Sequence, residues 1–426
     1  MSARPADVVI DDLANPRLPA AVTELMAAVG PMAQGLPFSP AGLMDQASSE
    51  TGLSDFGDPR FLEPLGVLVA AYDSEAGLSP FGRVSVFSQL VQLLKNRLLI
   101  TDVLTRHPEI HDVEIRRPII IAGLPRTGTT HLHNLLAADP ALRSLPYWES
   151  LEPVLSTSAQ PLPGEPDPRL ARTDDAVAFL DQALPYFKRM HEMTTWHVHE
   201  EIQLLAIDFS TMLFETMAPM PSYRDWYKAH DQTPSYAYLR TVLQVLQWAR
   251  GGTRWVLKSP QHLEQFQPLI ATFPDATVVV THRDPVAVTL SMATMISYTA
   301  RLHLQSVDPR AIGRYWAARG EDLFGACVRD RDVLPAEQSI DVRFHDFMAD
   351  EEKTVARVYE RAGQPMTEAA GEAMAEFVTS HPRGRHGGVR YQPEAVGMDV
   401  AERRAALKFY VDRFGVEEEK ITGGGG

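Results

Sequence analysis

Residues 123–130 (GLPRTGTT) have the residue types of a turn that binds an anion. They directly follow a β-branched run at residues 119–121 (III) and directly precede an apolar stretch of helical character at 131–138. A glycine-containing turn between a strand and a helix offers backbone N–H groups and the positive end of the helix dipole to an anion. The hydroxyls of Thr129 and Thr130 are further donors. The turn is therefore predicted to hold a phosphate or a similar group.

The same turn departs from the nucleotide-binding P-loop at one position. Its spacing nearly matches G-x-x-x-x-G-K-[ST], but Thr129 stands where the P-loop has its Lys. An ATPase uses that Lys on the β- and γ-phosphates, and no acidic Mg²⁺ ligand of Walker-B type follows a later strand. Ordinary ATP chemistry is therefore not favoured. A P-loop NTPase or small-molecule kinase that has lost its Lys is kept as an alternative, and it would bind MgATP.

Two more groups of polar residues follow short apolar runs. Lys258 follows the run RWVL, and Arg283 follows the run TVVVTH. Ser291 lies on the expected next helix, so a guanidinium fork and a hydroxyl flank the start of that helix and can bind one phosphate together. The alternative for Arg283 is an ion pair with Asp284 or a strand-capping role.

A basic, glycine-rich loop lies near the end of the chain at residues 382–388 (PRGRHGG). Arg383 and Arg385 supply positive charge, and a glycine such as Gly387 lets the backbone approach a phosphate closely. The loop is therefore a candidate for phosphate contact, and the alternative is a solvated basic loop.

In their order along the chain, these segments resemble the motifs of sulfotransferases that use 3′-phosphoadenosine-5′-phosphosulfate (PAPS). The turn is similar to the 5′-phosphosulfate loop of that family, and the order of the later segments is similar to that of the tyrosylprotein and heparan sulfotransferases. The Arg283–Ser291 spacing is that of the pair that grips the 3′-phosphate, and the basic loop resembles the one that closes on the same phosphate. The matching segments, within residues 117–391, are LPRTGTT (124–130), LKSP (257–260), LIATFPD (269–275), VVVTHRDP (278–285) and PRGRHGG (382–388).

The resemblance implies that the chain binds PAPS, releases adenosine 3′,5′-bisphosphate and needs no metal. Lys258 is then the cation at the bridging oxygen and the departing phosphate, and Arg126 assists in place of the Lys that cytosolic members often carry. Sulfuryl transfer is an in-line displacement in which the protein aligns the reactants and neutralises charge. The implied cofactor-binding residues are Pro125, Arg126, Thr127, Gly128, Thr129, Thr130, Arg283, Ser291, Arg383, Arg385 and Gly387.

A base must take the proton of the acceptor hydroxyl, and four residues are candidates. Glu149, in the segment LPYWE, lies in the region where the heparan and tyrosylprotein enzymes carry a catalytic Glu. The rivals are His199 and Glu200 in the segment WHVHEE, and His262, since cytosolic members use a His close to the equivalent of Lys258. Each could instead be a hydrogen-bonded residue at a helix end. WHVHEE is not the H-E-x-x-H pattern of a zinc site, so no metal site is predicted.

Short apolar strands that alternate with helices must position these residues. Such a pattern predicts a parallel sheet covered on both faces, whose strands end at one edge, where open α/β folds bind ligands. We therefore expect a P-loop-like three-layer α/β fold with a central parallel sheet flanked by helices, plus an N-terminal helical extension. Strands are predicted at 119–121, 254–257, 277–281 and 340–344, with helices at 131–138 and from about residues 261, 285 and 351.

The N-terminal region, 1–115, is expected to be mostly helical and packed on the core, because apolar residues recur at helical spacing from Val86 to Val103. The α/β core is expected at 116–392. It carries a helical insertion at about 173–250, rich in Met and aromatic residues, which forms either a lid or acceptor pocket or simply core. The chain is expected to end with a helix at 393–422 and a flexible glycine tail at 423–426.

Composition and charge limit the partners. The 426 residues include 40 Lys and Arg against 55 Asp and Glu, which gives a formal net charge of −15. This balance argues against nucleic acid and other polyanionic acceptors, although it permits a local basic pocket. Cys327 is the only cysteine, so nothing requires an oxidising compartment. Neither a signal peptide nor an apolar stretch long enough for a membrane span is found, so a cytoplasmic location is expected.

The sequence thus predicts transfer of a sulfuryl group from PAPS to a hydroxyl or amine of a small or medium-sized acceptor. An apolar or aromatic acceptor is favoured if the Met and aromatic residues of 173–250 line its pocket. A nucleotide-binding protein without turnover is the third alternative, and it would bind the bisphosphate without catalysing transfer.

Overall fold

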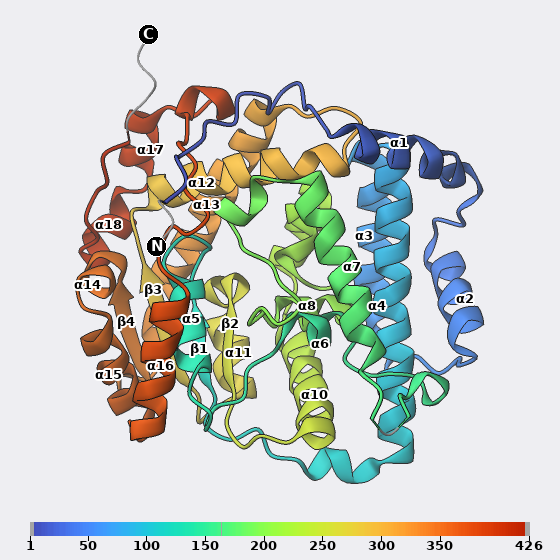
Figure 1. Cartoon of the computed structure of the whole chain (residues 1–426), viewed down its shortest axis with the longest axis horizontal. Helices are drawn as coiled ribbons and strands as arrows, with labels where there is room; N and C mark the ends of the chain where they lie inside the picture. The colour runs from blue at the N-terminus through green and yellow to red at the C-terminus, as the bar shows by residue number, and fades with distance from the viewer. Residues whose placement is uncertain (1–3, 163, 422–426) are drawn as a thin grey trace.

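One parallel sheet of four strands lies inside the computed structural model, which describes residues 4–162 and 164–421 (Figure 1). The order across the sheet is β2-β1-β3-β4. Every residue of the first three strands in sequence is buried, as a parallel sheet covered on both faces requires. This arrangement confirms the predicted α/β fold. The strands are β1 (Ile119–Ala122), β2 (Val256–Ser259), β3 (Thr277–His282) and β4 (Ser339–Arg343).

The ends of the strands differ from the prediction by at most two residues. The largest difference is in β2, which was predicted at 254–257 and begins at Val256. The carbonyl of Arg254 accepts a hydrogen bond from the backbone N–H of Arg143 at 2.8 Å, outside the ladder between β1 and β2. Because β2 extends from Val256 to Ser259, Lys258 lies inside the strand, opposite Ile121 of β1.

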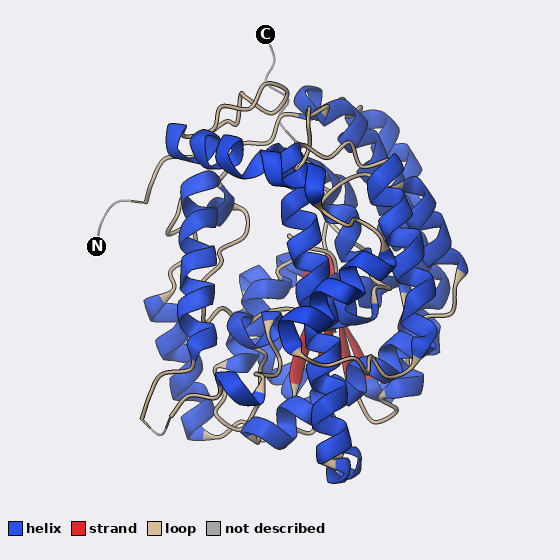
Figure 2. Cartoon of the chain, turned by 90° about the vertical axis from the view of Figure 1, so that its right-hand side faces the viewer, coloured by secondary structure: helices blue, strands red, loops and turns tan. Residues whose placement is uncertain are grey.

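The two faces of the sheet carry separate hydrophobic cores, and Figure 2 shows helices enclosing the strands. Ile119 and Ile121 belong to one core, whereas Ile120 and Ala122 belong to the other, because successive side chains of a strand point to opposite faces. The first core includes residues of α5 (Thr129–Ala137), α15 (Glu351–Ala362) and α16 (Glu368–Ser380). The second includes residues of α11 (Phe266–Thr272), α12 (Pro285–Thr299) and α13 (Pro309–Asp330).

Four N-terminal helices form the side of the molecule away from the sheet, on the right in Figure 1. The apolar residues predicted to share one face of the longest helix, from Val86 to Val103, are all buried. They belong to the same core as Ile120 of β1, so the N-terminal helices pack on the α/β part through continuous apolar contacts. The helices are α1 (Ala20–Val29), α2 (Pro40–Thr51), α3 (Leu62–Ser74) and α4 (Pro80–Arg106).

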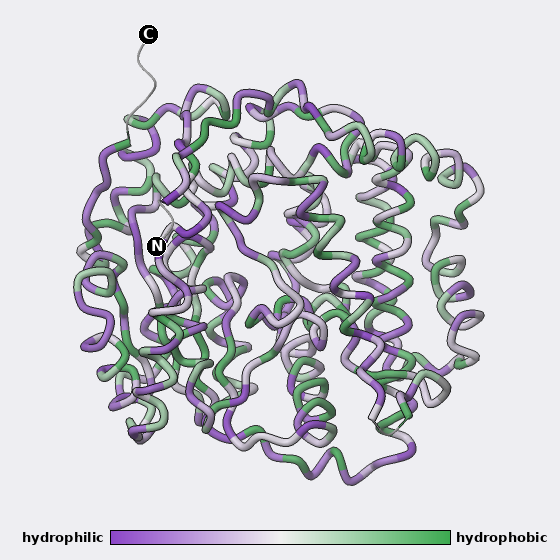
Figure 3. Tube along the Cα trace, in the orientation of Figure 1, coloured by the Kyte–Doolittle hydropathy of each residue, from purple (hydrophilic) through white to green (hydrophobic). Residues whose placement is uncertain are grey.

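The segment 173–250 is helical at its two ends and consists of short turns between them. Most of its Met and aromatic side chains are core: Met212, Phe214, Met220 and Tyr223 are fully buried in the same cluster as the sheet. In Figure 3, hydrophobic residues follow the strands and occur within α10. The helices here, with the short one that precedes them, are α6 (Tyr147–Leu151), α7 (Pro168–Ala183), α8 (Ile202–Leu205), α9 (Pro221–Ala229) and α10 (Thr233–Arg250).

The prediction of one C-terminal helix at 393–422 is wrong. Two short α-helices, α17 (Val400–Ala406) and α18 (Lys408–Phe414), follow a 3₁₀ turn at Pro393–Val396. Gly397 and Gly415 interrupt the helical path with φ of +65° and +60°, a left-handed conformation that glycine adopts at helix ends. Residues 423–426 lie outside the described part of the chain.

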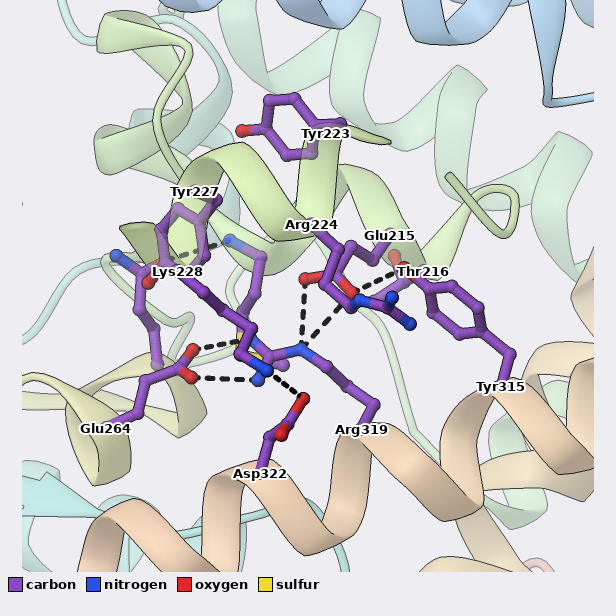
Figure 4. A network of polar contacts seen from close by, with 12 residues as sticks. Glu215, Thr216, Tyr223, Arg224, Tyr227, Lys228, Glu264, Tyr315, Arg319 and Asp322 are labelled. Atoms are coloured by element: carbon purple, nitrogen blue, oxygen red, sulfur yellow. Dashed lines mark hydrogen bonds and ion pairs between the residues drawn. The ribbon is translucent and has the colours of Figure 1, made fainter. Parts of the chain in front are cut away.

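A buried ion network fixes the turn after β2 to the surrounding helices (Figure 4). The fully buried guanidinium of Arg319, on α13, donates to the two carboxylate oxygens of Glu264 at 2.5 and 2.8 Å. Its Nε donates to Glu215 at 3.1 and 3.2 Å, and the hydroxyl of Tyr315 donates to the same carboxylate at 2.7 Å. Glu264 ends the 3₁₀ turn Pro260–Glu264, so the network holds the carboxyl end of β2 in place.

Candidate active site

The turn at 123–128 joins β1 to α5, and close packing defines its path. A Cβ on Gly123 would lie 1.9 Å from the hydroxyl oxygen of Thr281, so only glycine fits there. Gly128 has φ of +86° directly before α5. The hydroxyl oxygen of Thr127 lies 2.7 Å from that of Thr281, which ties the turn to β3. The first backbone N–H groups of a helix have no intrahelical acceptor, so this turn presents them at a fixed position.

Arg126 carries two features that are typical of a functional residue. Its φ is +75°, a left-handed conformation that is uncommon outside glycine. Its Nη1 donates to the carbonyl of Met190 at 2.7 Å, whereas its buried Nε has no hydrogen-bond partner among the described residues. Backbone strain and an unsatisfied buried donor both concentrate at binding sites.

A cavity of about 550 Å³ opens over this turn. Its walls come from the turn and the start of α5, from residues 188–197, and from the basic loop at 381–387. Eight of the residues predicted to bind the cofactor therefore share one cavity: Arg126, Gly128, Thr129, Thr130, Arg283, Arg383, Arg385 and Gly387.

A second cavity, of about 300 Å³, adjoins the first at the start of α12. Arg126 and Arg283 line both cavities, and Ser291 lines the second. The remaining walls of the second cavity come from Val9 near the N-terminus, from Arg390, Tyr391 and Gln392, and from the C-terminal residues Glu419, Lys420 and Ile421.

Arg283 is held between three groups. Its Nε and Nη2 donate to Glu419 at 2.6 and 2.8 Å, its Nη1 donates to the carbonyl of Arg126 at 2.5 Å, and its guanidinium lies 4.1 Å from the ring centre of Phe344. Asp284 has a different partner, since its carboxylate accepts from Arg404 at 2.7 and 2.8 Å. The alternative of an ion pair between Arg283 and Asp284 is therefore wrong.

Ser291 has a buried hydroxyl that no protein group satisfies. The residue is 3% exposed, and its Oγ has no hydrogen-bond partner within residues 4–162 and 164–421. An unsatisfied buried polar group costs about 1–3 kcal/mol, so natural proteins keep few of them without a reason. A ligand group in the second cavity would give this hydroxyl its partner.

The basic loop is fastened to the rest of the first cavity by ion pairs. Arg383 pairs with Glu351 at the start of α15. Arg385 pairs with Glu192, and the Nε2 of His386 lies 2.9 Å from the same carboxylate. The loop therefore forms part of the cavity wall, and charged contacts that an anion can replace hold it there.

Lys258 lies in a buried cluster at the end of β2. Its Nζ forms an ion pair with Glu200, and its backbone N–H donates to Glu201 at 2.7 Å. The Nε2 of His262 lies 2.6 Å from Glu201, and its Nδ1 lies 2.8 Å from the hydroxyl of Tyr236. The structure thus brings together three of the predicted catalytic residues, but both ring nitrogens of His262 are already engaged.

The other two candidate bases lie apart from the first cavity. Glu149 is 1% exposed, accepts from Arg143 at 3.0 and 3.1 Å, and pairs with Arg250 at 3.0 Å. His199 packs its ring 4.6 Å from that of Tyr147. Neither is among the described residues that line the cavity. Two arginines on one buried carboxylate indicate a structural role for Glu149.

Five histidines that the sequence analysis did not select as catalytic line the cavity, and two of them, His191 and His197, are the most deeply buried in its wall. Their ring centres are 5.4 Å apart, and the Nε2 of His197 is buried without a partner in the described chain. Burial is the main cause that lowers the pKa of each to about 3, and the positive charge of Lys258 lowers both further. Both imidazoles are therefore neutral at neutral pH. The HVH pattern contains His197 and His199 alike, and only the fold separates them.

The described residues contain neither a group of side chains that could hold a metal ion nor a helix that could cross a membrane. Within that part of the chain, no three His, Cys, Asp or Glu side chains are grouped so that they could hold a metal ion. No helix there combines the length and the apolar character that crossing a bilayer requires.

Comparison with known proteins places the chain in a family. Residues 118–368 match the model of the sulfotransferase family. The structure is similar to the crystal structures of sulfotransferase STF1 from Mycobacterium tuberculosis H37Rv (33% identity, TM-score 0.75, 86% of this chain and 97% of the other) and STF9 from Mycobacterium avium (27%, 0.79, 89% and 98%). The omega-hydroxy-beta-dihydromenaquinone-9 sulfotransferase Stf3 of Mycobacterium bovis is 21% identical over 320 residues, which are 70% of this chain and 75% of that protein. The chain therefore belongs to the sulfotransferase family, and it is an enzyme that transfers a sulfuryl group.

Proposed function

We propose that the enzyme takes its sulfuryl group from PAPS and transfers it to a hydroxyl or amine of a small, mostly apolar acceptor. The observation that carries this proposal is the pair of adjoining cavities that meet at Arg126 and Arg283. PAPS carries a phosphate at the 3′ position and a phosphosulfate at the 5′ position of the same ribose, so it needs two anion sites separated by about one ribose.

The residues of the second cavity fit the 3′-phosphate. Arg283 offers a guanidinium fork, which binds phosphate through two parallel N–H···O bonds. The unpartnered hydroxyl of Ser291 supplies a third donor from a position that is already buried. The exposed side chain of Arg390 lines the same cavity and adds positive charge at its mouth.

The turn at 123–130 fits the 5′-phosphosulfate. Its backbone N–H groups, the hydroxyls of Thr129 and Thr130, and the unpartnered Nε of Arg126 all surround the floor of the first cavity. Lys258, at the end of the neighbouring strand, is buried behind the cavity walls and lines neither cavity, and we propose it as the cation whose charge neutralises the departing phosphate oxygen. In the free enzyme, Glu200 neutralises that Lys.

In the transfer step, the acceptor oxygen forms a bond to sulfur while the bond between sulfur and the bridging phosphate oxygen breaks. The electron pair of that bond goes to the phosphate, and the acceptor proton goes to a base. We propose His197 as the base, because its imidazole lines the first cavity and has an unpartnered Nε2 among the described residues. None of the four candidates Glu149, His199, Glu200 and His262 lines this cavity, so they are no longer proposed for this role.

The proposed acceptor is apolar because of the side chains at the first cavity. Met190, Trp196, Met348 and Phe377 line it together with the histidines, and Trp196 is 61% exposed. The related Stf3 is named for an acceptor that is a hydroxylated menaquinone derivative. Both observations favour an apolar alcohol.

Ligand binding and transfer test the proposal separately. Adenosine 3′,5′-bisphosphate should stabilise the enzyme against heat without Mg²⁺, by roughly 2.7 kcal/mol at 100 times its Kd, and MgATP should not. Incubation with ³⁵S-labelled PAPS and an extract of the host should then label a lipid-soluble product. If ATP stabilises the enzyme and the bisphosphate does not, PAPS is not the donor.

A further inference from the structure

The C-terminal segment 416–421 returns to the second cavity after α18. The helix ends at Phe414, and the chain then runs back toward the start of α12, where Glu419, Lys420 and Ile421 line the cavity beside Arg283. This segment lies outside residues 118–368, the part that matches the family model.

Backbone contacts on two sides hold Glu419 in this position. Its N–H donates to the carboxylate of Asp284 at 2.7 Å, and its carbonyl accepts from Arg404 at 2.8 Å. Asp284 and Arg404 form an ion pair with each other, and Asp284 also accepts from the N–H of Val286 at the start of α12. The backbone of Glu419 is therefore anchored, while its side chain can rotate about its own bonds.

The carboxylate of Glu419 engages Arg283 in the way that a phosphate would. It accepts from Nε at 2.6 Å and from Nη2 at 2.8 Å, so its two oxygens take both N–H groups on one side of the guanidinium. The two side chains are 20% and 22% exposed, so water reaches the pair and opening it is not prohibitive. A 3′-phosphate that binds Arg283 through the same fork cannot do so while the carboxylate is there.

We infer that the carboxylate of Glu419 takes the place of the 3′-phosphate on Arg283 in the free enzyme, and that a 3′-phosphorylated nucleotide must displace it. This inference rests on the proposed function. The free enzyme then keeps Arg283 oriented and neutralised. Only the fraction of molecules with Glu419 turned away is competent to bind, so the apparent affinity and the association rate are lowered by that fraction. A nucleotide without a 3′-phosphate leaves Glu419 in place and is unaffected by it.

The test compares Glu419→Gln with Glu418→Gln. Glu418 is the matched control, because it is the adjacent carboxylate and lies near Arg404 Nε at 3.6 Å instead of on Arg283. The probes are adenosine 3′,5′-bisphosphate and adenosine 5′-phosphate. We expect E419Q to bind the bisphosphate about 2- to 5-fold more tightly than the wild type, the range of a partly exposed ion pair. The gain should appear in the association rate, with the dissociation rate unchanged, and E418Q should bind as the wild type does.

Every other outcome overturns the inference in a recognisable way. Unchanged or weaker binding of the bisphosphate by E419Q means that Glu419 supports the site and does not compete for it. An equal gain for adenosine 5′-phosphate, or an equal gain in E418Q, means a general effect of charge. If the wild type and both variants all fail to bind the bisphosphate, the proposed PAPS donor is wrong, and the role of Glu419 falls with it.

Discussion

Replacing Ser291 by Ala is expected to leave the free enzyme as stable as before while it weakens binding of adenosine 3′,5′-bisphosphate. The hydroxyl is 97% buried and unpartnered within the described chain, so its removal breaks no protein hydrogen bond and relieves an unsatisfied polar atom. The methyl group of Ala keeps the Cβ and the helical backbone of α12. The perturbation is therefore confined to the ligand contact.

The expected loss follows from the kind of hydrogen bond that the ligand would make. A hydroxyl that donates to a phosphate makes a hydrogen bond to a charged group, which contributes about 1.5–3 kcal/mol. At 1.4 kcal/mol for each tenfold change, the Kd should rise about 10- to 150-fold. The neighbouring Arg283 fork remains, so binding should be weakened and not abolished.

The assay is titration calorimetry with two ligands and a matched control variant. Ser297 lies on the same helix, is fully buried, and has a hydroxyl that also lacks a partner among the described residues, but it does not line the second cavity described above. Ser297→Ala should therefore leave the Kd of the bisphosphate unchanged. With adenosine 5′-phosphate, which has no 3′-phosphate, neither variant should differ from the wild type.

Three results would refute parts of this reasoning. Equal losses of bisphosphate affinity in S291A and S297A would show that the effect comes from repacking of α12. Equal losses for the bisphosphate and the monophosphate in S291A would show that the hydroxyl does not face the 3′-phosphate. A lower melting temperature of S291A would mean that the hydroxyl has a protein or water partner in the free enzyme.

Three further changes test the other parts of the structure. His197→Gln should lower kcat about 10²- to 10⁴-fold with the acceptor found by labelling and keep the Kd of the bisphosphate, as expected for loss of a general base; an unchanged kcat excludes it. Lys258→Met should lower kcat about 10²- to 10³-fold, and NMR titration should show the pKa of His197 rising, because the Lys charge holds it down. Arg319→Met should lower the free energy of unfolding by about 3–5 kcal/mol in urea denaturation, because it leaves Glu215 and Glu264 buried without their cation; a loss below 1 kcal/mol contradicts that.

Local sequence patterns were sufficient to predict the sheet. Runs such as 119–121 and 277–281 are apolar, β-branched and short, and each is followed by a glycine or proline turn and a helix, so strand type and parallel direction follow together. The prediction failed at 393–422, where the pattern is weaker. There Gly397 and Gly415 adopt left-handed conformations that end helical stretches. A glycine in a helical pattern does not by itself show whether it will continue the helix or end it.

The residues that line the proposed anion site were predictable because the strand-turn-helix geometry places them. The base proposed above was not, because the position of His197 depends on contacts between distant segments. Glu149 follows the expected helix as the family pattern requires, yet Arg143 and Arg250 bind it away from the cavity. His197 lies in an irregular segment whose path is set by packing against the rest of the chain, and no periodicity in the sequence distinguishes its direction from that of His199.

The net charge of −15 fits with an anion site because the acidic residues neutralise the basic ones inside the site. Four ion pairs do this, and their partners lie 32 to 193 residues apart along the chain, so neither the composition nor a local motif could indicate them. On the proposed function, binding of the donor exchanges these carboxylates for phosphate and sulfate groups, so the free site does not hold a cluster of unpaired cations that would bind any anion. Affinity then depends on whether a ligand can bind several of these cationic side chains at once, and this selects one nucleotide more strongly than positive charge alone does. The pairs are Lys258 with Glu200, Arg283 with Glu419, Arg383 with Glu351 and Arg385 with Glu192.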